Sequence, residues 1–317
     1  MKTLSQKVCL RYLPGISLLL NIGFGFTQQA RAGTLQGGSS TEMLHNGWNY
    51  ALDSFNDGFD GTSIGDTSAV EFFGMAMRED SDRLYFAFNT NLSQNGLFER
   101  YAWDSRISYG DFFLNFANPS SFDDANGQLY AIHFNDNDNF FRGMEWGLYE
   151  NVQAGELVLS NANAGVLYGD GSLQQTQAVI EAEGGSVSYG DLASDTDYLD
   201  LTQAAPTMIQ TGTKIGDIDT LDADALATLQ LDFGYFNATG TETFGFSVER
   251  DLLPSTEFIA HLFIDSGNEG IALQGNLGGS PSWADPGKKI PEPGSVVGLG
   301  LVGLLMWRWR QIAQATL

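Results

Sequence analysis

Residues 83–89 read Arg83-Leu84-Tyr85-Phe86-Ala87-Phe88-Asn89, and this stretch decides the fold class. Leu84, Phe86 and Phe88 occupy alternate positions, which is the period of a β-strand with one buried face. Comparable short apolar runs recur at 70–77, 111–117, 128–134, 156–160, 229–236, 242–249 and 256–265. The pattern therefore predicts strands throughout the central part of the chain.

Turn-forming residues separate these runs. Asn46-Gly47, Asn95-Gly96 and Asn126-Gly127 are typical of tight turns between strands, as are acidic-glycine pairs such as Asp57-Gly58. Helical periodicity is weak, and only 220–231 indicates a short helix or a switch from helix to strand. We therefore predict an all-β domain, built as a two-sheet β-sandwich of jelly-roll or lectin-like type.

One short segment occurs twice in the expected β domain. Ser-Tyr-Gly-Asp stands at 108–111 and again at 188–191, but the residues on either side do not match. Because only these four residues agree, we interpret the two copies as a recurring turn rather than as a duplication.

The N-terminus has the three parts of a secretory signal peptide. Basic residues precede an apolar run at 16–26, and Ala30-Arg31-Ala32 forms a small-residue cleavage site. We predict that signal peptidase cleaves between Ala32 and Gly33. The single cysteine, Cys9, lies inside this signal, so the exported chain has no thiol for disulfides, zinc sites or nucleophilic catalysis.

The C-terminal tail also has three parts in order. Pro291-Glu292-Pro293 is followed by an uncharged apolar run at 294–307 and then by Arg308 and Arg310. As a helix, the fourteen residues of the run would span about 21 Å, less than the ~30 Å hydrocarbon core of a bilayer. Flanking tryptophans and arginines extend this reach, so we expect a single short transmembrane helix. Such a marginal span suits a segment that is recognised and removed.

This tail resembles the PEP-CTERM sorting signal of exosortase-dependent bacterial surface proteins. The resemblance implies that a membrane-embedded exosortase recognises Pro291-Glu292-Pro293 while the chain is transiently anchored in the inner membrane. It also implies delivery to the cell envelope, the cell surface or the extracellular matrix. The expected layout is a signal peptide at 1–32, an all-β exported domain at 33–275, a Gly/Pro linker at 276–290 and the sorting signal at 291–317.

Segments 48–62, 70–78 and 109–116 carry a second likeness. They resemble the corresponding part of a family of exosortase-dependent surface proteins known mainly from cyanobacteria. This resemblance implies the same extracellular location and assigns no catalytic residue.

The charge of the chain excludes several classes of partner. The whole chain has a net charge of −24 at pH 7, and segment 33–287 holds seven basic against thirty-eight acidic residues. Nucleic acids and anionic lipids are bound through clusters of Lys and Arg, which this segment lacks. We therefore expect contact with a membrane only through the C-terminal tail.

Calcium is the best candidate ligand, and no other cofactor is expected. Asn135, Asp136, Asn137 and Asp138 follow a predicted strand, and a second group of acidic residues contains Asp53, Asp57 and Asp60. A third group lies at 217–224. Closely spaced Asp and Asn residues on a loop supply several of the six to eight oxygen ligands that Ca²⁺ takes. None of the three matches the EF-hand loop, and such residues also favour turns for conformational reasons.

The sequence leaves three functions open. We expect a structural or adhesive surface protein that associates with extracellular polysaccharide or biofilm material and has no enzymatic activity. A calcium-dependent carbohydrate-binding module is the first alternative, and its sugar-stacking aromatic residues would be chosen from Trp48, Tyr50, Trp103, Tyr109, Trp146, Tyr149 and Trp283. A secreted glycan-active enzyme with paired carboxylates is the second alternative.

Overall fold

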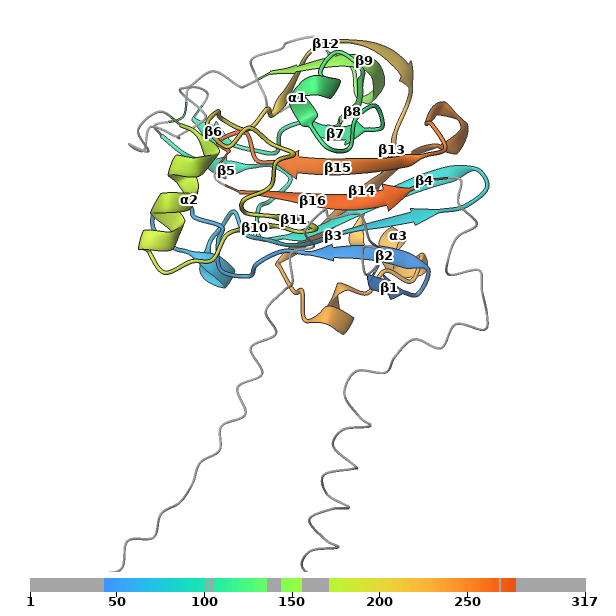
Figure 1. Ribbon diagram of the computed structural model, residues 1–317. Helices are drawn as coiled ribbons and strands as arrows, with labels where there is room; N and C mark the ends of the chain where they lie inside the picture. The colour runs from blue at the N-terminus through green and yellow to red at the C-terminus, as the bar shows by residue number, and fades with distance from the viewer. Residues whose placement is uncertain are drawn as a thin grey trace, which may run out of the picture. The chain divides into compact units, whose positions relative to one another are not determined.

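The computed structural model describes residues 43–100, 102, 105–135, 144–155, 171–267 and 269–277, all of which belong to the unit Ala32–Leu317 (Figure 1). The predicted signal peptide and sorting signal lie outside the described residues, as does nearly all of the predicted linker. Among the described residues, none of the helices has the length and apolar character needed to cross a bilayer.

The described part of the chain is mainly β-structure, as predicted, and its first large sheet has six antiparallel strands in the order β1-β2-β3-β4-β14-β13. The strands are β1 (Met43–His45), β2 (Trp48–Leu52), β3 (Phe72–Glu79), β4 (Arg83–Thr90), β13 (Asp219–Leu221) and β14 (Glu242–Glu249). Strands β3, β4 and β14 confirm three of the predicted apolar runs.

The second large sheet also has six antiparallel strands, in the order β12-β9-β8-β7-β15-β16. The strands are β7 (Phe112–Asn115), β8 (Leu129–His133), β9 (Gly147–Gly155), β12 (Met208–Gly216), β15 (Glu257–Phe263) and β16 (Gly270–Asn276). Strands β7, β8 and β15 confirm three more predicted runs, whereas 156–160 lies outside the described residues.

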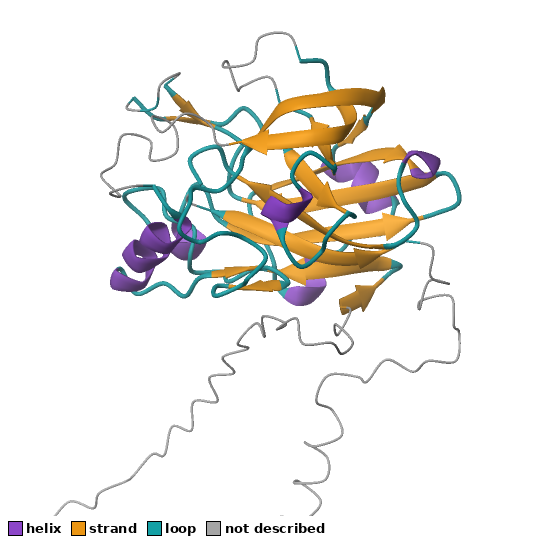
Figure 2. Cartoon of the chain, turned by 45° about the horizontal axis from the view of Figure 1, so that its top comes forward, coloured by secondary structure: helices purple, strands orange, loops and turns teal. Residues whose placement is uncertain are grey.

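Smaller elements surround the two sheets (Figure 2). Two short antiparallel pairs are formed by β5 (Leu97–Phe98) with β6 (Arg106–Ile107) and by β10 (Ser188–Tyr189) with β11 (Leu192–Ala193). The α-helices are α1 (Phe122–Ala125), α2 (Leu173–Ala182) and α3 (Ala223–Thr228), and the 3₁₀ turns are η1 (Gly65–Thr67), η2 (Phe233–Phe236) and η3 (Arg250–Leu252).

The inner faces of the two large sheets share one hydrophobic core. Leu84, Phe86 and Phe88 of β4 are fully buried in it, and the ring of Phe86 lies 4.8 Å from that of Phe112 on β7. Each such side chain contributes about 1.5–3 kcal/mol by leaving water. The alternating residues Leu84, Phe86 and Phe88 therefore lie on the buried face of β4, as predicted, and this face packs against the second sheet.

The outer faces are partly covered as well. Trp48, Ala87 and the α3 residue Leu226 share a cluster on the outside of the first sheet. Phe113 of β7 and Phe122 of α1 belong to a third cluster on the outside of the second sheet. This cover explains why many strands carry apolar residues on both faces instead of strict alternation.

The turn between β1 and β2 follows the sequence closely. His45 pairs with Trp48, so Asn46 and Gly47 form a two-residue turn, with φ of 51° and 80°. Turns of this kind need positive φ at both positions, which Asn and Gly adopt most readily. The predicted Asn-Gly turn is confirmed.

The predicted strand at 229–236 is wrong. Its second half forms η2 (Phe233–Phe236), whose first residue is buried. Asp232 caps this turn by accepting a hydrogen bond from the N–H of Tyr235 at 3.0 Å, and Asn237 ends it in the left-handed region at φ 61°. The aromatic residues here pack onto the outside of the first sheet rather than alternate along a strand.

Helix α2 has no counterpart among the predicted elements. Ser172 caps its N-terminus by accepting a hydrogen bond from the N–H of Gln175 at 3.3 Å. Its buried residues are Leu173, Thr176 and Ile180, which have helical spacing. Because a threonine interrupts the apolar stripe, hydrophobic periodicity alone gives a weak signal for this helix.

Candidate metal centre

Four acidic side chains meet where the two sheets come together. Asp53 directly follows β2 and Asp57 comes four residues later, whereas Glu71 directly precedes β3 and Glu269 directly precedes β16. Strand β16 of the second sheet packs beside β2 and β3 of the first. All four residues are nearly inaccessible, with exposed fractions of 0–3 %. We call this group the carboxylate cluster.

The first oxygen of Asp53 is fully used by hydrogen bonds. Its Oδ1 accepts bonds from the N–H of Ser54 at 3.0 Å, from Oγ of Ser188 at 2.8 Å and from the N–H of Gly190 at 3.0 Å. These bonds join the loop after β2 to the β10–β11 hairpin. They fix the Asp53 carboxylate, and none of them involves its other oxygen, Oδ2.

Asp57 and Glu71 are each held by one backbone N–H. Ser188 donates to Oδ2 of Asp57 at 2.7 Å, and Gly58 donates to Oε2 of Glu71 at 2.8 Å. A Cβ atom at position 58 would lie 2.7 Å from Cα of Glu71, so only glycine permits this close approach. Gly58 therefore serves the cluster, whereas the turn of this loop lies at Phe55 and Asn56 and not at the predicted Asp57-Gly58.

Each carboxylate of the cluster also has an oxygen without a hydrogen-bond donor among the described residues. These atoms are Asp53 Oδ2, Asp57 Oδ1, Glu71 Oε1 and Glu269 Oε1. Asp53, Asp57 and Glu269 each offer an oxygen within 4.8 Å of the other two. None of the ion pairs between described residues includes a member of the cluster.

Burial and mutual repulsion govern the protonation of the cluster. Burial raises the pKa of Asp53 to about 7, although hydrogen bonds from Gly190, Ser188 and Ser54, and one shared with the Glu269 carboxyl, oppose the rise. Burial, followed by repulsion from the neighbouring carboxylates, raises the pKa of Asp57, of Glu71 and of Glu269. Four like charges in a dry site are unfavourable without a compensating positive charge.

The arrangement fits a hard divalent cation. Two oxygens that each lie about 2.4 Å from one Ca²⁺ are separated by at most about 4.8 Å, which is compatible with the spacing of the three carboxylates. Asp53, Asp57 and Glu269 could therefore bind the same ion, and Glu71 lies beside them. Ca²⁺ suits such a protein-enclosed oxygen site better than Mg²⁺, which keeps several of its waters.

The structure brings together two of the three residues that the sequence grouped around Asp57. Asp60 lies apart from the cluster, and its carboxylate accepts hydrogen bonds from the N–H groups of Thr62, Ser63 and Ala69 at 2.7–3.0 Å. It therefore folds the loop between β2 and β3, while Asp53 and Asp57 remain as candidate ligands.

The other predicted acidic groups have different outcomes. Asn135 is buried and donates from Nδ2 to the carbonyl oxygen of Tyr109 at 3.1 Å, whereas Asp136, Asn137 and Asp138 lie outside the described residues. In the third group, Asp217 pairs with Lys214, Asp219 pairs with Arg83, and Asp222 caps α3. Surface pairing and helix capping thus account for these three members of the third group.

The serine and the aspartate of the repeated Ser-Tyr-Gly-Asp segment make similar hydrogen bonds in both places. Ser188 donates through its N–H and hydroxyl to Asp57 and Asp53, and Ser108 donates through both groups to Oδ2 of Asp265 at 3.0 Å. The last residue of each copy then binds a strand edge. The N–H of Asp191 donates to the carbonyl oxygen of Ala272, and its Oδ2 accepts from the N–H of Gln274. In the same way, the N–H of Asp111 donates to the carbonyl oxygen of Thr207, and its Oδ2 accepts from the N–H of Ile209.

The backbones of the two copies differ, however. Residues 190–191 form the two-residue turn of the β10–β11 hairpin, with φ 60° at Gly190, whereas no turn is formed at 108–111. The prediction of a recurring turn is therefore wrong, and what recurs is the hydrogen bonding of the serine and the aspartate.

Glu71, Glu269 and Ser188 belong to the centre but were not among its predicted residues. The repeated tetrapeptide was the available signal for Ser188. Glu71 and Glu269 carry no local signal beyond being acidic residues immediately before strands.

Most of the aromatic residues considered for sugar stacking belong to the hydrophobic clusters. Trp48, Tyr50, Tyr109 and Tyr149 are at most 6 % exposed, so they cannot form an open face. Trp146 is 41 % exposed. Trp103 and Trp283 lie outside the described residues.

Comparisons of the chain with protein-family models, with curated proteins and with solved structures found no match.

Proposed function

We propose that the protein is an exported surface or matrix protein whose all-β domain is stabilised by a Ca²⁺ ion bound at the carboxylate cluster. Its role is structural or adhesive, in association with extracellular polysaccharide or biofilm material. The observation that carries the metal proposal is the set of four buried carboxylate oxygens that lack a donor. Extracellular modules bind Ca²⁺ with dissociation constants of roughly 10⁻⁴–10⁻³ M, which suits a site that fills outside the cell.

Export rests on the two terminal signals of the sequence. The proposed signal peptide ends at Ala32, and the proposed sorting signal runs from Pro291 through a short transmembrane helix to Arg310. Signal peptidase and an exosortase are the proposed processing partners. The two facing six-stranded sheets support assignment to the jelly-roll or lectin-like sandwiches.

The geometry favours a structural cation over a sugar-binding one. A Ca²⁺ that bridges sugar hydroxyls needs ligand positions open to solvent, whereas the cluster residues are at most 3 % exposed. The same burial argues against glycoside cleavage by this group of carboxylates, because paired catalytic carboxylates must reach the glycosidic bond. The proposal therefore assigns no enzymatic activity.

The metal proposal is tested by thermal unfolding of the full chain in CaCl₂, in MgCl₂ and in EDTA. A hundredfold excess of Ca²⁺ over its dissociation constant should stabilise the fold by about 2.7 kcal/mol, and Mg²⁺ should give less. Glu269→Gln should lose most of this response, since it removes one ligand charge and keeps the side-chain shape. Identical unfolding of the original chain in CaCl₂ and EDTA, together with no calorimetric heat of binding, would overturn it.

The sorting proposal needs a separate measurement in the native host. Replacing Pro291, Glu292 and Pro293 by alanine should shift the chain from the surface and medium into the inner-membrane fraction. Replacing Gln311 by alanine serves as a control in the same tail. An unchanged distribution of the triple variant would contradict exosortase sorting without bearing on the metal centre.

A further inference from the structure

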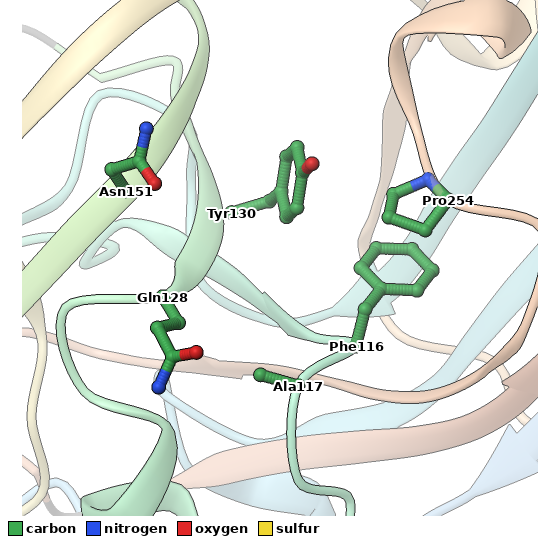
Figure 3. Close-up of a pocket in the computed structure, with 6 residues that line it drawn as sticks. All are labelled: Phe116, Ala117, Gln128, Tyr130, Asn151 and Pro254. Carbon is green, nitrogen blue, oxygen red and sulfur yellow. The ribbon is translucent and has the colours of Figure 1, made fainter.

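A small pocket lies on the second sheet, beside the end of β7, β8 and β9 and the loop after η3. It has a volume of about 300 Å³ and is lined by Phe116, Ala117, Gln128, Tyr130, Asn151 and Pro254 (Figure 3). This volume is at the lower end of the range for small-molecule sites. It has room for one small ring.

Two aromatic rings form a fixed corner of the pocket. Phe116 stacks on the core residue Phe258 at 4.7 Å, and Tyr130 meets Phe116 at 5.5 Å with an interplanar angle of 82°. Both rings pack against the inner core but are only partly buried. Because packing holds them in place, a ligand need not order them on binding.

The polar part of the pocket is uncharged and available. The side chains of Gln128, Tyr130 and Asn151 make no hydrogen bond to another described residue, and none of the six lining residues carries a charge. Two amides and one hydroxyl offer both donors and acceptors. In a chain with a net charge of −24, an uncharged recess does not suit an anionic ligand.

A β-bulge places Asn151 at the pocket. Leu129 pairs with Val152 and Ala131 pairs with Tyr149, so two residues of β9 stand opposite Tyr130 alone. Asn151 is one of these two, and its φ of 53° lies in the left-handed region. Bulges of this kind redirect a side chain and are common beside binding sites.

We propose that this pocket binds one neutral pyranose unit of a polysaccharide. A pyranose ring has apolar C–H faces that pack on aromatic side chains, and its hydroxyls donate to and accept from amides. The proposal rests on the polysaccharide association in the proposed function and supplies a contact site for it. It does not require Ca²⁺ in the pocket, because no lining residue offers a carboxylate.

The test uses saturation-transfer NMR and calorimetry on the folded, Ca²⁺-saturated full chain, with cellohexaose, laminarihexaose and mannohexaose as neutral probes. Oligomannuronate is the anionic probe. At least one neutral probe should bind saturably, and the anionic probe should not. Asn151→Gly removes the amide and keeps the backbone conformation, because glycine adopts positive φ readily. This variant and Tyr130→Ala should each weaken binding roughly tenfold.

Tyr235→Ala is the matched control, because Tyr235 is 51 % exposed on η2 and does not line the pocket. It should leave sugar binding unchanged. Saturable binding that survives both pocket variants would overturn the assignment, as would no binding of any neutral probe by the folded chain. If Ca²⁺ still stabilises that chain, the pocket assignment alone fails and the metal proposal stands.

Discussion

An acidic side chain lies at each end of strand β3, and the two differ in their charged neighbours. Glu79, the last residue of the strand, pairs with Arg250, whose guanidinium also donates to the carbonyl oxygen of Leu253 at 2.9 Å and to Oγ of Ser255 at 2.8 Å. Glu71, directly before the strand, lies among three other carboxylates and has no cationic partner among the described residues.

The two ends differ in the source of the positive charge that neutralises the carboxylate. At Glu79 the chain supplies it from Arg250, so no ion from solution is needed after folding. At Glu71 the surrounding charged groups are carboxylates, and the positive charge must come from solution or be replaced by protons. Ionic conditions should therefore affect one end of β3 and leave the other unchanged.

Arg250→Met should produce the largest effect, because it leaves Glu79 without its partner. Removing one member of a buried ion pair costs roughly 3 kcal/mol, and the loss should be equal in Ca²⁺ and in EDTA. Chemical denaturation of the variant in both media measures it. Adding Glu79→Gln should recover part of the loss, and a deficit that depends on Ca²⁺ would break the proposed contrast between the two ends.

The pH dependence of the metal-free protein should come next. The pKa of Asp53 is raised on folding, to about 7, so the folded state retains a proton that the unfolded chain releases near pH 4. Stability from this proton is present at low pH and is lost as pH rises, by about 2 kcal/mol between about pH 5 and about pH 6.5. Asp191, whose pKa burial also raises to about 7, adds to the same trend.

Saturating Ca²⁺ should flatten or reverse this slope, because the ion requires deprotonated ligands. Urea unfolding at several pH values, with and without Ca²⁺, gives the comparison. Equal slopes in the two series would mean that the cluster does not bind the ion.

The double variant Asp53→Asn with Asp57→Asn should give an effect of opposite sign in the two media. The amide oxygens keep the bonds from Ser188, while the two carboxyls, which in the metal-free protein must bind a proton or stay charged in a buried site, are removed. In EDTA at neutral pH the variant should gain on the order of 1.5 kcal/mol over the original chain. In excess Ca²⁺ it should be the less stable protein. Thermal melts in both media test this crossing, and a variant less stable in both would contradict it.

Asp60→Asn should show the smallest change. It weakens the acceptor for three backbone N–H groups in the loop between β2 and β3, at a cost of about 1 kcal/mol. Its response to Ca²⁺ should match that of the original chain in the same melting assay. A reduced response would place Asp60 at the metal centre after all.

Much of the fold could be predicted from local patterns. Alternation identified β4, and short apolar runs located five further long strands of the two sheets. The same rule failed at 229–236, where aromatic residues cover the outside of a sheet instead of extending it. Local periodicity reports that a residue is buried, but not which neighbour buries it.

The candidate site was predictable only in part, for a related reason. Asp53 and Asp57 are four residues apart on one loop, so their proximity is visible in the sequence. Glu269 reaches them because β16 of the other sheet packs beside β2 and β3, a relation between distant segments that no local pattern contains. Asp60 shares the loop but turns its carboxylate to the backbone, which spacing cannot reveal.

The Ser-Tyr-Gly-Asp segment at 188–191 restricts where the chain can accept insertions. Segment 188–191 is attached to the cluster at its serine and to the edge of β16 at its aspartate, so it tethers the connection that runs from α2 toward β12. Insertions at the exposed residues Gly184 and Asp195 should be tolerated, because they lengthen chain between fixed points. Insertions within the four residues should not, since the two attachments require one fixed span. The tetrapeptide thus fixes one point of a long connection, and the chain before and after that point can change in length.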